Sequence, residues 1–230
     1  ANVGDLARAM ANRRTGIGFD QLLVVRNGEI TSYAMEIWNA DGSRAEMCGN
    51  GIRCVAKYVY DHGICQNESL TIETGAGVLS LEVEVAEGKV ELVRVDMGEP
   101  ILAAAEIPTT LPGDPVVDVP LHIGEQSFPV TCLSMGNPHC VTYVDNADDE
   151  WVLGRGPQIE TAPEFPARVN AEFVEIVSRT EVRQRTWERG SGETLACGTG
   201  AGAVCVAGVL SGRTDRTIIV HLSGGDLQLK

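Results

Sequence analysis

A short motif occurs twice in this sequence, each time at the same distance from a tryptophan. Residues 47–51 read MCGNG and residues 196–200 read ACGTG, which places Cys48 and Cys197 at an offset of 149 positions. Trp38 and Trp187 have the same offset, and each lies ten residues before its cysteine. Apolar residues with helical spacing follow both motifs, at 51–62 and 200–211. This repeat predicts two similar halves, each with a strand that ends in tryptophan, a polar loop and a helix that begins near the cysteine.

Strand patterns dominate the rest of the chain. Residues 102–120 lack a clear period and predict a linker or long loop, and residues 145–166 predict an irregular region with a short helix near 148–153. We therefore expect an α+β fold of two pseudo-symmetric domains, with boundaries at 1–96 and 97–230. β-branched or alternating runs between Gly, Asn and Pro predict strands at 21–26, 32–38, 69–73, 78–85, 90–97, 128–133, 140–144, 171–177 and 181–187.

The repeat also predicts a segment that the given sequence does not contain. The polar cluster MGNPHC at 135–140 precedes the second cysteine, and the first-half equivalent of Asn137 would lie before residue 1. We expect a strand or two and a polar turn to belong there.

Composition excludes several classes of protein. The chain has 230 residues and a net charge of −14, which argues against nucleic acid or an anionic membrane as its main partner. No apolar run approaches the roughly 20 residues that span a bilayer, and no secretory leader is visible, so we expect a cytoplasmic protein. The seven cysteines form no Cys-x-x-Cys pair, which gives no support to a zinc site, and we expect no bound metal.

A cysteine at the start of a helix has a special chemical environment. Unpaired N–H groups and the positive end of the helix dipole stabilise an anion there, and the pKa of a thiol in such a place can fall to roughly 3.5–7.5. The neighbouring glycines let a carboxylate approach the same backbone amides. The alternative is that Cys48 and Cys197 are small buried residues at tight turns. We expect that structural role for the other five cysteines: Cys54, Cys65, Cys132, Cys140 and Cys205.

Two such thiols suit the inversion of a stereocentre. A thiolate removes a proton from one face of the carbon, and the partner thiol returns a proton to the other face. The helix starts would stabilise the negative charge that develops on the adjacent carboxylate. This mechanism needs neither a metal nor an organic cofactor, and we expect none.

Eight blocks of the sequence resemble the diaminopimelate epimerases. The resemblance implies a cofactor-independent enzyme of lysine and peptidoglycan synthesis that interconverts LL- and meso-diaminopimelate. It also implies a pair of domains, each a mixed β-sheet curled around a central α-helix, and a homodimer in the cytoplasm, or in the plastid stroma of a plant or alga. Relative to the family, the given sequence lacks the first strand with its Asn-containing turn and the closing strands. The blocks are GIGFDQ (16–21), IWNADGS (37–43), EMCGNGIRC (46–54), DMGEP (96–100), SMGNPHC (134–140), FPARVNAEF (165–173), WERGSGET (187–194) and ACGTGA (196–201).

The same resemblance implies roles for individual residues. Cys48 and Cys197 correspond to the acid and base, and His139 and Glu188 correspond to positions that tune the cysteine pKa values. The types agree with the substrate, because diaminopimelate carries two carboxylates and two ammonium groups. By themselves, the Asn and Gln side chains would rather be turn or cap residues, and His139 a core histidine. The implied substrate-binding residues are Gln21, Asn39, Gly49, Asn50, Asn137, Asn170, Glu188, Arg189, Gly198 and Thr199.

Three other functions stay open from the sequence. Proline racemases and hydroxyproline epimerases use the same two-thiol plan, but they usually show CGHG at the first cysteine, where this chain has CGNG. The Glu188–Arg189 pair would also have no use with a substrate that lacks a distal charged end. A non-catalytic module that binds amino acids or peptides is the second alternative, and binding without α-proton exchange would mark it. A redox sensor that joins Cys48 to Cys197 is the third.

Overall fold

The structure is a computed structural model that describes residues 2–45 and 47–230. The chain divides into two compact units, Ala1–Met97 and Gly98–Lys230, and each is described by itself. In the part of the chain that the structure describes, no helix is long and apolar enough to cross a membrane.

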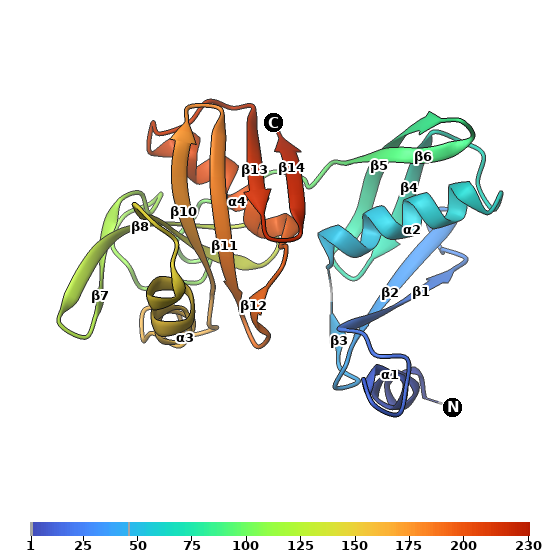
Figure 1. Cartoon of the computed structure of the whole chain (residues 1–230), viewed down its shortest axis with the longest axis horizontal. Coiled ribbons are helices and arrows are strands. Elements are labelled where there is room, and N and C mark those ends of the chain that lie inside the picture. Colours follow the sequence, from blue (N-terminus) through green and yellow to red (C-terminus); the bar gives the residue numbers. More distant parts are fainter. Residues whose placement is uncertain (1, 46) are drawn as a thin grey trace. The chain divides into compact units, whose positions relative to one another are not determined.

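The first unit is a six-stranded sheet with one long helix packed on it (Figure 1). The strand order is β1-β2-β4-β5-β6, with the short β3 paired to β2. β2 and β4 are parallel, and the other pairs are antiparallel. Apolar residues of α2 at a spacing of three and four, among them Ile52, Val55 and Val59, form the core with the sheet. The elements are α1 (Val3–Ala11), β1 (Gln21–Arg26), β2 (Tyr33–Asn39), β3 (Arg44–Ala45), α2 (Gly49–Asp61), β4 (Ser69–Thr74), β5 (Gly77–Ala86) and β6 (Lys89–Val95).

The second unit is an eight-stranded sheet of order β14-β13-β11-β10-β9-β8-β7, with β12 paired to β11. The β9–β10 and β11–β13 pairs are parallel. The helix α4 packs against β8, β9 and β10, and a core that includes Phe128, Val152, Ile159 and Phe173 joins the sheet to η1 and α3. The elements are β7 (Val119–Ile123), β8 (Gln126–Ser134), β9 (Pro138–Tyr143), the π-helix η1 (Glu150–Arg155), α3 (Gly156–Glu160), β10 (Asn170–Ser178), β11 (Glu181–Glu188), β12 (Gly192–Thr194), α4 (Gly198–Leu210), β13 (Ile218–Leu222) and β14 (Gly225–Leu229).

The duplication that the sequence predicts is present in the strand register. Leu22 pairs with Trp38 in the first unit, and Ala171 pairs with Trp187 in the second, at the same offset of 149. The helices α2 and α4 have 13 residues each and begin one residue after their cysteines. The order β1-β2-β3-α2-β4-β5 in the first unit therefore corresponds to β10-β11-β12-α4-β13-β14 in the second.

Three features differ from the sequence predictions. The helix α1 and the short strands β3, β7, β12, β13 and β14 were not predicted. Residues 102–120 do run without long regular structure, but β7 begins within them, and Ile107, Leu111 and Val116 are buried in the core of the second unit. This segment is therefore not a free linker.

The prediction that Cys54 is buried was wrong. Cys54 is exposed, whereas Cys65, Cys132, Cys140 and Cys205 are buried as expected. The reason is helical geometry, because the buried residues of α2 lie on one face and position 54 falls on the other.

Candidate functional site

Cys48 is the N-cap residue of α2. Its backbone is extended (φ −146°, ψ 102°), and its Sγ accepts a hydrogen bond from the amide of Gly51 at 3.2 Å. The side chain is half-buried. The first N–H groups of a helix have no intrahelical acceptor, so the thiol satisfies one of them and lies at the positive end of the dipole.

Cys197 has the equivalent position at the start of α4. Its backbone is again extended (φ −125°, ψ 111°), and its Sγ lies 3.4 Å from the amide nitrogen of Gly200 and 3.4 Å from the hydroxyl oxygen of Thr199. Unlike Cys48, it is buried, with 5% of its surface exposed. Both predicted cysteines therefore cap helices, in the geometry that the repeat predicts.

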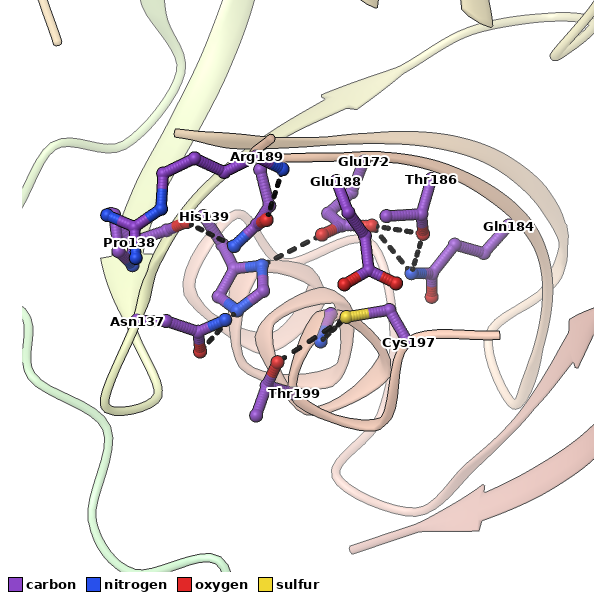
Figure 2. A network of polar contacts seen from close by, with 12 residues as sticks. Asn137, Pro138, His139, Glu172, Gln184, Thr186, Glu188, Arg189, Cys197 and Thr199 are labelled. Carbon is purple, nitrogen blue, oxygen red and sulfur yellow. Dashed lines mark hydrogen bonds and ion pairs between the residues drawn. The ribbon is translucent and has the colours of Figure 1, made fainter. Parts of the chain in front are cut away.

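Burial and two carboxylates set the proton affinity of Cys197. Burial, followed by the negative charges of Glu172 and Glu188, raises the pKa of the Cys197 thiol well above its usual range, against the opposing hydrogen bonds of Thr199 and Gly200. The half-buried Glu188 accepts a hydrogen bond from the Thr194 hydroxyl at 2.5 Å. Figure 2 shows the carboxylate of Glu188 next to the sulfur of Cys197, and burial raises the pKa of Glu188 as well. Cys197 is therefore in the thiol form around neutral pH.

A polar network that is mostly buried lies beside Cys197 (Figure 2). The carboxylate of Glu172 accepts hydrogen bonds from His139 Nδ1 at 2.8 Å, from Gln184 Nε2 at 2.8 Å and from the Thr186 hydroxyl at 2.5 Å. His139 Nε2 lies 3.0 Å from Oδ1 of Asn137. Of these residues, Glu172, Gln184 and Thr186 were not singled out from the sequence, although Glu172 lies in one of the family blocks.

The structure assigns a local role to two other predicted residues of the second unit. Asn170 is buried and bridges two segments, because its Nδ2 donates to the carbonyl of Pro138 at 2.9 Å and its Oδ1 accepts from the amide of Arg189 at 2.8 Å. Arg189 is exposed, and one guanidinium nitrogen donates to the carbonyl of Ala167 at 3.1 Å. Asn170 therefore fixes the turn that carries Arg189.

The remaining predicted residues, apart from Gly198, lie in the first unit. Gln21 and Asn39 are cross-strand partners, and Gln21 Nε2 donates to Asn39 Oδ1 at 3.0 Å. Asn50, in the first turn of α2, accepts a hydrogen bond from Arg53 at 2.7 Å. Gly49 and Gly198 are the first residues of α2 and α4.

Among residues 2–45 and 47–230, no group of three or more His, Cys, Asp or Glu side chains could hold a metal ion.

Comparison with known proteins assigns the family. The family model described as diaminopimelate epimerase matches residues 1–103 and 131–230. The diaminopimelate epimerase of Leptospira biflexa is 51% identical over 223 residues, which cover 96% of this chain and 80% of that protein. The diaminopimelate epimerase of Moorella thermoacetica is 48% identical, over 98% of this chain and 81% of that protein. This chain belongs to the diaminopimelate epimerase family.

Solved structures of more distant proteins share the fold. A probable proline racemase from Agrobacterium radiobacter matches with a TM-score of 0.73 over 98% of this chain and 71% of that protein, at 17% identity. A hydroxyproline epimerase from Agrobacterium vitis matches with a TM-score of 0.70 over 96% of this chain and 70% of that protein, at 16% identity. At these identities the likeness concerns the fold alone, and it agrees with the two-unit α+β fold that the sequence predicts.

Proposed function

We propose that this chain interconverts LL- and meso-2,6-diaminopimelate without a cofactor, with Cys48 and Cys197 as the acid and base. The observation that carries the proposal is that two thiols cap two equivalent helix starts. Membership of the diaminopimelate epimerase family supplies the substrate, which links the chain to lysine and peptidoglycan precursor synthesis.

The two thiols have different surroundings, and this asymmetry supports a division of roles. Cys197 lies near Glu172 and Glu188, and both carboxylates favour the thiol form. We assign Cys197 as the proton donor in the direction of reaction in which Cys48 acts as the base. In the reverse direction the roles exchange, because each turnover transfers one proton to Cys48 and removes one from Cys197.

The transition state places negative charge on the carboxylate attached to the reacting carbon. When Cys48 takes the α-proton, the electron pair of the C–H bond moves toward that carboxylate, and Cys197 then delivers its proton to the opposite face. The first turns of α2 and α4, with Gly49, Asn50, Gly198 and Thr199, offer backbone N–H groups to the carboxylate.

The distal end of diaminopimelate carries a second carboxylate and a second ammonium group. Arg189 suits the distal carboxylate, and Glu188 suits an ammonium. Amide side chains at Gln21, Asn39, Asn137 and Asn170 complete the proposed recognition set. We further propose a homodimer in the cytoplasm, or in the stroma of a plastid, as the family resemblance implies.

Proton NMR in D₂O tests the reaction directly. The protein, kept reduced, is expected to exchange the α-proton of LL-diaminopimelate for deuterium and to produce the meso isomer. Cys48→Ser and Cys197→Ser should each abolish epimerisation while leaving the thermal melting temperature nearly unchanged.

The choice of substrate separates the alternatives. trans-4-Hydroxy-L-proline should show no exchange, because it has no distal charged end for Glu188 and Arg189. Exchange of hydroxyproline but not of diaminopimelate would assign a proline-type epimerase instead. Saturable binding of diaminopimelate without any exchange would assign a binding module.

A further inference from the structure

The carboxylate of Glu172 is completely buried. None of its surface is exposed, and its two oxygens accept three hydrogen bonds, from His139, Gln184 and Thr186. Oε2 accepts from both Gln184 and Thr186, and Oε1 faces Nδ1 of His139. A carboxylate buried in this way needs hydrogen bonds, and in its ionised form an opposite charge, to compensate for the loss of solvent.

The first unit shows that the fold does not need a carboxylate at this position. At the offset of 149, Glu172 corresponds to Leu23, and Thr186 corresponds to Ile37. Leu23 and Ile37 are cross-strand partners, as Glu172 and Thr186 are. Ile37 belongs to the apolar core of the first unit, and the partly buried Leu23 packs against that core. The equivalent cross-strand pair is therefore apolar in the first unit and polar in the second.

The side chain of Gln184 directs its amide N–H groups to Glu172 and Thr186. Its Nε2 donates both to Glu172 and to the hydroxyl of Thr186 at 2.9 Å. Its Oε1 is buried and has no hydrogen-bond partner among the described residues. An unpaired buried carbonyl is unfavourable. The amide of Gln184 nevertheless directs its N–H donors to Glu172 and leaves its own oxygen without a hydrogen bond.

His139 lies between Glu172 and Asn137. Nδ1 is 2.8 Å from Oε1 of Glu172, and Nε2 is 3.0 Å from Oδ1 of Asn137. Each ring nitrogen therefore faces an oxygen, an arrangement that a ring with a proton on both nitrogens satisfies. The amide nitrogen of Asn137 is then turned away from His139 as a donor, and Asn137 itself is only half-buried.

We propose that Glu172 is ionised and His139 protonated on both nitrogens, and that Glu172 is a positioning residue that, through His139, holds the amide of Asn137 with its Nδ2 donor toward a carboxylate of the substrate. The identity of that substrate rests on the proposed function. Without the charge of Glu172, His139 would lose the proton on Nε2. Asn137 would then rotate its amide to donate to Nε2, and its oxygen would repel the carboxylate.

The variant Glu172→Gln removes the charge and keeps the shape. Gln184 can rotate its amide so that its unpaired Oε1 accepts from the new side chain, so the fold should survive. The first readout is ¹⁵N NMR of the imidazole side chains in the unliganded protein near pH 8, with the His139 signals assigned from a His139→Gln variant. We expect both ring nitrogens of His139 to be protonated in the original protein and Nδ1 alone in Glu172→Gln. A neutral His139 in the original protein, or the same charge in both proteins, would overturn the proposal.

The second readout is steady-state kinetics with diaminopimelate. Loss of a charge-assisted contact predicts a KM about tenfold higher in Glu172→Gln, with a smaller change in kcat. Gln184→Met, which installs the first-unit residue at the equivalent position, is the matched control, because it preserves the contact between Glu172 and His139. It should keep His139 cationic and change KM much less. Equal KM increases in the two variants would show that Glu172 contributes only to packing and would overturn the proposal.

Failure of the proposed function and failure of the role proposed for Glu172 give different results. A protein that does not turn over diaminopimelate would contradict the proposed function, whereas the charge of His139 is measured without any substrate and decides the role of Glu172 separately.

Discussion

Replacement of Gly156 by alanine is expected to force α3 away from β11. A Cβ atom at this position would lie 2.7 Å from Cβ and 2.8 Å from Cγ of Trp187, whereas carbon atoms in contact are normally about 3.5–4.0 Å apart. These atoms are the root of a side chain whose indole nitrogen donates to Glu160 at 2.8 Å. Trp187 therefore has little freedom to withdraw, and the backbone of α3 must move.

A neighbouring glycine, Gly154, is a reference for the loss of stability expected in Gly156→Ala. Overpacking of a core usually destabilises by about 1–3 kcal/mol, while Gly→Ala within a helix stabilises by up to about 1 kcal/mol. A Cβ at Gly154 would meet only the carbonyl oxygen of Asp149, at 3.9 Å. Gly154→Ala should therefore stabilise by about 0.5–1 kcal/mol, and Gly156→Ala should be less stable than Gly154→Ala by about 1–3 kcal/mol.

Urea unfolding followed by circular dichroism and tryptophan fluorescence measures this difference. For a slope of about 2 kcal/mol per molar urea, the two midpoints should differ by about 0.5–1.5 M. Because Trp187 directly precedes Glu188, Gly156→Ala should also slow α-proton exchange, and Gly154→Ala should not. Equal midpoints, or a Gly154→Ala protein that is the less stable of the two, would refute this description of the packing.

Two predictions concern pH. Cys197 should react with iodoacetamide at lower pH in Glu188→Gln, since the negative charge of Glu188 contributes to its raised pKa; peptide mass spectrometry measures the profile, and an unshifted one contradicts the assignment. Hydrogen bonds from His221 to Asp226 and Glu181 raise the pKa of the half-buried His221 above its unfolded value. Its stabilising effect is therefore complete below about pH 6.5 and is lost as pH rises through the folded pKa. His221→Gln should accordingly lower the melting temperature more near pH 5.5 than near pH 9, and an equal loss at both would show that packing, not charge, is responsible.

The sequence was sufficient to predict the local units of the fold. Each tryptophan lies ten positions before its cysteine, and an apolar helix follows at once, so the strand, the loop and the cap all lie within one short stretch. This spacing predicts where both helices begin. It also agrees with the pairing of Trp38 and Trp187 with the strands that precede theirs. Short strands such as β13 and β14, with five residues each, carry too little alternation to be separated from loops without knowledge of their partners.

The polar network under Cys197 could not be predicted in the same way. Glu172 stands among apolar residues, and in the sequence it is one acidic residue in a strand. Its importance depends on the register of β10 with β9 and β11, which brings His139, Thr186 and Gln184 to it from distant parts of the chain. One signal was available in the sequence, since the repeat aligns Glu172 with an apolar leucine.

The sulfur atoms of Cys48 and Cys197 each accept an amide hydrogen of the helix that follows. Alkylation of either sulfur adds a bulky group at that acceptor, so it is expected to weaken the first turn of the helix as well as to block the thiol. Loss of an N-cap typically costs about 0.5–2 kcal/mol. Alkylation of Cys48 or Cys197 should therefore couple inactivation to a lower stability.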